Sequence, residues 1–184
     1  MVVLVALHVA GEEVASVLRY DRDASRWYTF FTASFVHFDY QHLLLNLVIF
    51  VSVIKLFESE LDGRILWFIV VICGYASVCV EHIMGKPPFM LEVIDQTYGL
   101  SGACYGLITY CAASKAFRGR LSGAVLCALL VCKVSIEAII QGPLFYSSVD
   151  TPAVFGHLGG ALSGALLAVI VRHLIPFATR KVGL

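Results

Sequence analysis

Apolar segments long enough to cross a membrane follow one another along almost the whole chain. Of its 184 residues, 59% are hydrophobic and only 14% are charged. A helix needs roughly 20 mainly apolar residues to cross the hydrocarbon core of a bilayer. Segments of this kind lie near residues 2–18, 40–57, 65–84, 98–114, 121–141 and 153–175. Because backbone polar groups in a bilayer must be satisfied within the chain, we predict an all-α, polytopic membrane helical bundle of about six transmembrane helices.

The first of these segments is the least typical of a membrane span, because it is short and contains Glu12 and Glu13. No long polar linker or low-complexity stretch divides the remaining segments, so we expect residues 1–184 to form a single domain. The apolar segments continue almost to the end of the chain, which is not the pattern of a cleaved signal peptide followed by a soluble protein.

Charge and cysteine content argue against several classes of protein. The 13 basic and 13 acidic residues cancel, so net charge gives no sign of nucleic-acid binding. The six cysteines all lie in apolar stretches without a C-x-x-C pair, which favours small core residues over a disulfide framework or a metal site. They are Cys73, Cys79, Cys104, Cys111, Cys127 and Cys132. We therefore expect no nucleic-acid partner, no metal and no cofactor.

Basic residues near the later spans predict how the chain lies in the membrane. They are Lys115, Arg118, Arg120, Arg172, Arg180 and Lys181. Since lysine and arginine are enriched in cytoplasmic loops, we expect this side of the bundle to be cytoplasmic. The connection at 143–152 has no basic residue and carries Asp150, which favours the outer side. Arg19, Arg22 and Arg26 would then lie on the outer side, which opposes this orientation. We base the predicted orientation on the later clusters of basic residues.

Three short polar motifs stand where the second, fourth and sixth spans begin. H-L-L-L-N places His42 and Asn46 one turn apart on the same helix face. G-L-S-G contains Ser101, and G-H-L-G-G contains His157. Two spans separate each motif from the next, so these helices enter the membrane from the same side. The four side chains are therefore predicted at similar depth, where polar groups are costly and often functional.

These residue types suit nucleophilic catalysis. A serine hydroxyl needs a base to take its proton, and a neutral histidine can do so, which pairs Ser101 with His157. The oxyanion formed by attack on an amide needs donors, and the Asn46 amide and the backbone N–H of Ser101 could supply them. His42 is a further donor or a substrate-positioning group.

Glycines surround both motifs of the proposed pair. Gly99 and Gly102 flank the serine and permit an abrupt turn into the helix. Gly156, Gly160 and Gly164 recur every four residues along the helix of His157, a stripe that lets two membrane helices pack closely. Such packing could bring the histidine ring to the serine.

Each polar residue also has a purely structural interpretation. A serine in a membrane helix often bonds back to its own backbone, and a lone histidine or asparagine often joins neighbouring helices. Convergence of four such residues at one depth favours a catalytic site. For Lys133 and Glu137, at i and i+4, we favour mutual neutralisation over contact with a substrate.

At these motifs the sequence resembles the rhomboid intramembrane serine proteases. The matching segments are F-V-H-F-D-Y-Q-H-L-L-L-N at 35–46, Y-G-L-S-G-A-C-Y-G at 98–106 and G-H-L-G-G-A-L-S-G at 156–164. The resemblance implies that Ser101 and His157 form a dyad without a carboxylate. It also implies that His42 and Asn46 help to line the oxyanion hole, and that Tyr105 packs on the histidine.

A narrower similarity is to the rhombosortases, a bacterial branch that trims C-terminal Gly-Gly-type sorting tails. It rests on L-R-Y-D-R at 18–22 ahead of Trp27, on the lack of an extra soluble domain, and on K-V-S-I-E at 133–137 followed by Gln141 and Gly142.

The resemblance implies hydrolysis of a peptide bond in or next to a client transmembrane segment, near the outer membrane face. Transmembrane proteins and the lipid bilayer would be the partners, and no oligomeric state is predicted. The expected location is the bacterial inner membrane, with the site open to the periplasm. Two alternatives remain: a catalytically silent relative that binds transmembrane helices, and a small transporter that uses His42, His157, Lys133 and Glu137.

Overall fold

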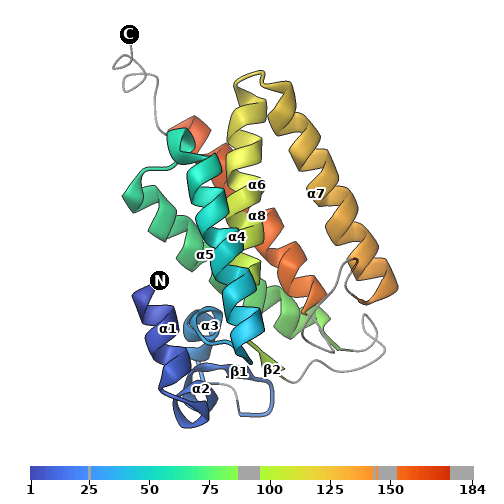
Figure 1. The fold of residues 1–184 in the computed structure, drawn as a ribbon. Helices are drawn as coiled ribbons and strands as arrows, with labels where there is room; N and C mark the ends of the chain where they lie inside the picture. The colour runs from blue at the N-terminus through green and yellow to red at the C-terminus, as the bar shows by residue number, and fades with distance from the viewer. Residues whose placement is uncertain (25, 87–95, 143, 145–152, 175–184) are drawn as a thin grey trace.

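Five long helices form the bundle in the computed structural model, which describes residues 1–24, 26–86, 96–142, 144 and 153–174 (Figure 1). They are α4 (Tyr40–Leu56), α5 (Gly63–Met84), α6 (Ser101–Phe117), α7 (Leu121–Ile140) and α8 (Val154–Leu174). Each lies close to one of the predicted spans, and the all-α prediction is confirmed. In Figure 1, α4, α6 and α8 begin at the lower end of the bundle, as the span order predicts.

The segment at 2–18, the least typical of the predicted spans, does not form one continuous helix. It consists of α1 (Val2–Val9) and α2 (Glu12–Leu18), which have 8 and 7 residues. The break lies at Gly11, whose φ of 87° is in the left-handed region. Glu12 and Glu13 then occupy the first turn of a new helix, where the helix dipole favours acidic residues.

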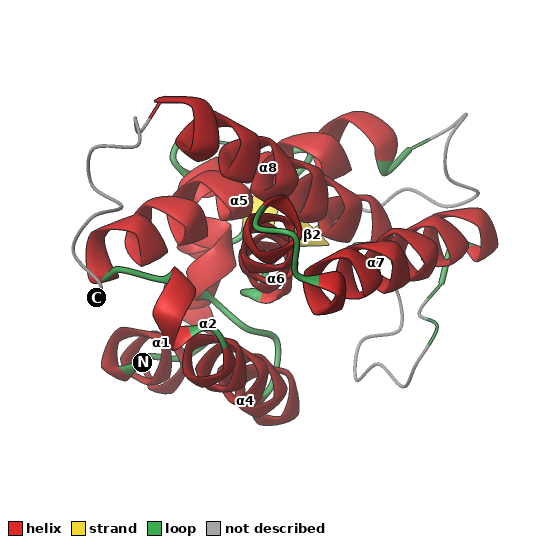
Figure 2. Ribbon diagram, turned by 90° about the horizontal axis from the view of Figure 1, so that it is seen from above, coloured by secondary structure: helices red, strands yellow, loops and turns green. Residues whose placement is uncertain are grey.

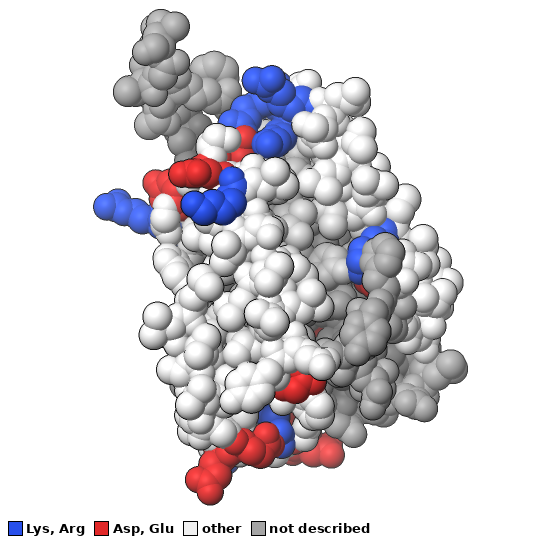
Figure 3. Space-filling model, in the orientation of Figure 1, with Lys and Arg blue, Asp and Glu red and all other residues white. Residues whose placement is uncertain are grey.

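Three helices of the described part of the chain are long and apolar enough to cross a membrane: α5, α7 and α8. A fourth span is possible if α4 is joined to residues 29–35, which meet it at an angle of 89°. Figure 3 shows charged side chains gathered at the two ends of the visible face, with a largely uncharged band between them.

Helix α6 lies at the centre of the bundle, among α4, α5, α7 and α8 (Figure 2). Its 17 residues span about 26 Å at 1.5 Å per residue, slightly less than the thickness of a typical hydrocarbon core. Leu107, Cys111 and Ala112 on this helix are completely buried. The neighbouring helices therefore shield α6 along much of its length.

The glycine stripe of α8 lies directly against the backbone of α6. A Cβ atom at Gly160 would lie 2.7 Å from the carbonyl carbon of Gly102, and one at Gly164 would lie 2.7 Å from that of Gly106. No real side chain fits at such distances. The two helices therefore pack backbone to backbone, as small residues permit in membranes.

A short sheet and two small helices that the sequence did not predict lie before α4 and α6. Strand β1 (Tyr20–Asp21) pairs antiparallel with β2 (Gln96–Thr97), next to α3 (Thr29–Thr32) and the 3-10 helix η1 (Ala33–Phe35). Another 3-10 helix, η2 (Glu58–Glu60), follows α4. The β pairing ties the N-terminal segment to the residues just before α6.

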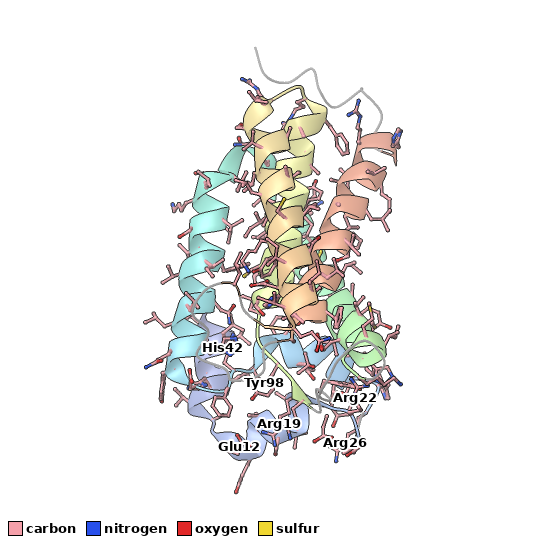
Figure 4. The ribbon with its side chains drawn as sticks, turned by 90° about the vertical axis from the view of Figure 1, so that its right-hand side faces the viewer. Glu12, Arg19, Arg22, Arg26, His42 and Tyr98 are labelled. Carbon is pink, nitrogen blue, oxygen red and sulfur yellow. The ribbon has the colours of Figure 1, made fainter. Side chains whose placement is uncertain are left out.

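Arg19, Arg22 and Arg26 lie at the end of the bundle where α4 begins (Figure 4). The Arg22 guanidinium donates to three backbone carbonyls at the end of α5, with the shortest distance, 2.6 Å, to that of His82. Arg19 forms an ion pair with Glu12 at 2.5 Å. Arg19 and Arg22 thus have structural partners nearby. They lie at the end of the bundle that is predicted, from the later clusters of basic residues, to face the outer side.

None of the six cysteines, all of which the structure describes, forms a disulfide. Cys73, Cys104 and Cys111 are buried, in agreement with the predicted core role. Cys132 is exposed on α7, so for this residue the core prediction is wrong. Its helix carries many exposed apolar side chains, and an apolar thiol is equally suited to face lipid.

Replacing Gly160 by alanine should destabilise the bundle, because the added methyl group collides with the backbone of Gly102. We expect the free energy of unfolding to fall by about 1–3 kcal/mol, measured by denaturant titration in mild detergent. Gly63→Ala is the matched control, since a Cβ atom there has no neighbour within 4 Å. Equal stability of the two variants would contradict the close packing of α6 and α8.

Candidate active site

Ser101 and His157 meet at the end of the bundle where α6 and α8 begin. Ser101 is the first residue of α6, and His157 lies in the first turn of α8. The His157 Nε2 atom lies 3.2 Å from the Ser101 hydroxyl oxygen, within hydrogen-bond distance. When Nε2 carries no proton, the hydroxyl can donate to it, which is the arrangement of a nucleophile and its base.

The residues just before α6 are held by contacts with two other elements. Gly99 has a φ of 109°, and its N–H donates to the Ala33 carbonyl at 3.0 Å. The Leu100 N–H donates to His37 Nε2 at 3.3 Å. A Cβ atom at Gly99 would lie 2.9 Å from His42 Nε2. Both the backbone conformation and the closeness of the imidazole therefore require glycine here.

His37 is a site residue that our sequence reasoning missed. Its ring is buried, with 4% exposed, and packs edge-on against His42 with ring centroids 5.2 Å apart. It stands in the short connection that enters α4, and the only available signal was a polar ring close to the H-L-L-L-N motif. Its contact with the Leu100 N–H holds the backbone directly before Ser101.

His42 and Asn46 lie on the same face of α4 but differ in what they contact. The His42 ring rests against Gly99, directly beside the start of α6. Asn46 is buried, and its side-chain amide donates to the His42 carbonyl at 3.0 Å, within its own helix. The structure thus brings His42 to the serine motif, whereas the bond described for Asn46 is within α4.

Gly102, Gly160 and Gly164 contribute through the helix contact described above. Gly102 directly follows Ser101, and its carbonyl lies against Gly160, one turn beyond His157. The close contact between α6 and α8 therefore lies directly beside Ser101 and within one turn of His157.

Tyr105, one turn beyond Ser101, stacks on the His157 ring. The ring centroids are 4.5 Å apart and the planes are 25° from parallel. The tyrosine hydroxyl contacts Lys133 Nζ, which also lies 4.9 Å from the centre of the tyrosine ring. This stack limits rotation of the imidazole about its side-chain bonds.

Lys133 and Glu137 form the predicted pair on α7, and the pair lies beside the histidine. Lys133 Nζ is 2.5 Å from Glu137 Oε1. The second carboxylate oxygen, Oε2, is 3.6 Å from His157 Nδ1. The i, i+4 spacing indicated the pair, but nothing in it indicated that the carboxylate faces α8.

Glu81 on α5 is a second site residue that sequence reasoning missed. It is completely buried, and its Oε2 accepts a hydrogen bond of 2.6 Å from the Gly156 N–H, next to His157. The first N–H groups of a helix lack partners within it, so this carboxylate caps α8 from a neighbouring helix. A lone acidic residue in an apolar span was the available signal.

The arrangement brings a serine hydroxyl, an imidazole and a helix N-terminus together at one point. The backbone N–H of Ser101 opens α6, where it has no acceptor within the helix and where the dipole favours negative charge. Such a set of groups is suited to acyl transfer. Within the described ranges, no group of three or more His, Cys, Asp or Glu side chains is placed to hold a metal ion.

Comparison with protein families identifies a domain that covers most of the chain. The family model of the Rhomboid domain matches residues 24–174, which include all five long helices and every motif of the site. No curated protein matches the sequence significantly. The chain is therefore an integral membrane protein that belongs to the rhomboid family, whose members are generally intramembrane serine proteases.

Proposed function

We propose that this protein is an intramembrane serine endopeptidase, with Ser101 as its nucleophile and His157 as its base. The observation that carries the proposal is the 3.2 Å contact between His157 Nε2 and the Ser101 hydroxyl at the start of α6. The substrate is a transmembrane protein, cut in or next to its membrane segment.

The reaction follows from the pair. His157 Nε2 takes the hydroxyl proton as Ser101 Oγ attacks the scissile carbonyl carbon, and it then protonates the leaving amine. Water attacks the resulting ester in the same way and releases the acid. The stack of Tyr105 on the imidazole keeps the ring in the plane that this exchange needs.

The oxyanion would form near three donors. The Ser101 backbone N–H is the first, at the positive end of the α6 dipole. The amide nitrogen of Asn46 carries two hydrogens, and its bond to the His42 carbonyl uses one of them. The second hydrogen of Asn46, and the ring of His42 beside Gly99, are the further donors that we propose.

We place the cut near the outer face of a bacterial inner membrane, with the site open to the periplasm. Supporting this, Lys115 lies in the last turn of α6, and Arg118 and Arg120 lie between α6 and α7, at the opposite end of α6 from Ser101. A client helix must unwind locally there, because its own hydrogen bonds shield the scissile carbonyl. We also propose that residues 1–184 act as one domain.

A catalytically silent relative and a small transporter are the competing interpretations. A silent helix-binding protein needs no contact between a serine hydroxyl and an imidazole, whereas this chain keeps that contact. A transporter of charged substrates would use Lys133 and Glu137 as a binding pair, but Lys133 already contacts both Glu137 and Tyr105. The geometry therefore favours the enzyme.

A fluorophosphonate should label the purified protein on Ser101, because only an activated serine reacts readily with this reagent. Ser101→Ala and His157→Ala should remove the labelling, while Ser122→Ala, at the other end of the bundle, should keep it. Gel fluorescence gives the extent of labelling, and peptide mass spectrometry gives the modified residue. Labelling that survives in either of the first two variants would rule out the proposed pair.

The finer proposal is that the clients carry Gly-Gly-type C-terminal tails, as in rhombosortases. A pair of glycines costs a helix roughly 2 kcal/mol relative to alanine, so the extended form needed at the serine is easier to reach. Small residues also allow close approach of the client backbone to Ser101.

Two client peptides that differ only at this pair test the preference. Both carry a single transmembrane helix with basic residues after it, one preceded by Gly-Gly and the other by Leu-Leu. We expect efficient cleavage at Gly-Gly and little at Leu-Leu, located by mass spectrometry of the products. Cleavage of general rhomboid substrates with the Gly-Gly client left intact would refute the finer proposal alone.

A further inference from the structure

We propose that Glu137 is a positioning residue for His157, so that this chain carries a Ser–His–Glu arrangement instead of a dyad. The inference rests on the proposed function, since it concerns the same base. It departs from the carboxylate-free pair that the family resemblance implies.

Two buried polar atoms without hydrogen-bond partners face each other in the site. They are His157 Nδ1 and Glu137 Oε2, and neither has a hydrogen-bond partner among the described residues. The distance between them is 3.6 Å, too long for a hydrogen bond but within reach of a small movement. Catalytic hydrogen bonds are often long before substrate binds.

The other carboxylate oxygen of Glu137 is anchored, which leaves Oε2 directed at the imidazole. Oε1 accepts from Lys133 Nζ at 2.5 Å and from the Leu144 N–H at 3.1 Å. Leu144 lies just beyond α7, which ends at Ile140 and is followed by Gln141 in the left-handed conformation, with a φ of 54°.

These contacts form a closed ring around the base. His157 stacks on Tyr105, the Tyr105 hydroxyl contacts Lys133, Lys133 pairs with Glu137, and Glu137 faces His157 again. The ring joins α6, α7 and α8 at the level of Ser101. A carboxylate that served only to neutralise Lys133 would not need to face the imidazole.

The other titratable groups near His157 occupy different sides of it. His42 approaches from α4, and Glu81 of α5 binds the backbone N–H of Gly156 rather than the ring. Ser101 faces Nε2, and Tyr105 covers the ring face. Among the described residues, Glu137 is the acceptor placed opposite Nδ1.

The chemical role follows from this placement. An Nδ1–H that donates to Glu137 Oε2 fixes the tautomer in which Nε2 is free to accept the Ser101 proton. When Nε2 takes that proton, the ionised carboxylate stabilises the imidazolium. Glu137 itself neither gains nor loses a proton, and the proton on Nε2 passes to the leaving amine.

Nitrogen NMR of the ¹⁵N-histidine-labelled full chain in detergent micelles tests the placement without any need for activity. The His157 signals are identified by their loss in His157→Gln. We expect neutral His157 of the wild type to carry its proton on Nδ1, and Glu137→Met to lose this preference. Retention of the Nδ1–H tautomer in Glu137→Met overturns the inference.

The double variant Lys133→Met/Glu137→Met separates positioning from charge neutralisation, because it removes both charges together. We expect it to lack the Nδ1–H preference, as Glu137→Met does, and to react slowly with a fluorophosphonate, by about 10²-fold or more relative to wild type. Recovery of the wild-type tautomer and rate in the double variant would show that Glu137 merely balances Lys133, and would overturn the inference.

The pH dependence of labelling gives a readout that a purely structural role would not move. In Glu137→Gln the acid limb of the rate profile should shift to lower pH, since a neutral amide no longer favours the imidazolium. Glu81→Gln is the matched control, a buried carboxylate on the backbone side, and should keep the wild-type limb. An unshifted acid limb in Glu137→Gln overturns the inference about Glu137. If the wild type is not labelled at all, the proposed function is refuted, and the NMR result alone decides the inference about Glu137.

Discussion

At Gly160 and Gly164 the backbone of α8 touches the backbone of α6 with no side chain between them. In a bilayer there is little hydrophobic gain in bringing two apolar helices together, so close packing of small residues supplies much of the attraction. Here the same contact joins Gly102, directly after Ser101, to Gly160, one turn beyond His157. The distance of 3.2 Å between the Ser101 hydroxyl oxygen and His157 Nε2 therefore depends on how closely α6 and α8 can approach. A larger side chain at either glycine would separate the two groups without altering their chemistry.

Several polar groups fix the ends of the helices that form this contact. Glu81 caps the start of α8, and His37 binds the backbone just before α6. The pairing of β1 with β2 fixes the residues that lead into α6, while Arg22 binds the carbonyls that end α5. Each of these groups would be costly if left unpaired in an apolar environment. Their partners come from other elements, so these contacts join several elements where the chemistry is proposed to occur.

Sequence alone was sufficient for features that repeat locally along the chain. Long apolar runs gave α4 to α8, and the number of spans between motifs put Ser101 and His157 at the same end. The division of 2–18 into two short helices was not predicted, because hydropathy does not register the left-handed turn at Gly11. His37 and Glu81 were missed because each acts through a backbone N–H of a distant element.

The spacing of Lys133 and Glu137 predicted the pair. It did not predict that the second carboxylate oxygen of Glu137, Oε2, faces His157, because that depends on how α7 packs against α8. The catalytic roles and the client remain predictions.

Cleavage by purified protein in lipid vesicles is the most direct test of the proposed pair. A transmembrane client is reconstituted with the wild type, Ser101→Ala or His157→Ala, and the products are measured by mass spectrometry alongside the thermal stability of each variant. We expect the wild type to cut the client near one membrane face. Neither variant should show measurable turnover, and the stability of both should be nearly unchanged. Turnover near the wild-type rate in either variant would contradict the proposed pair.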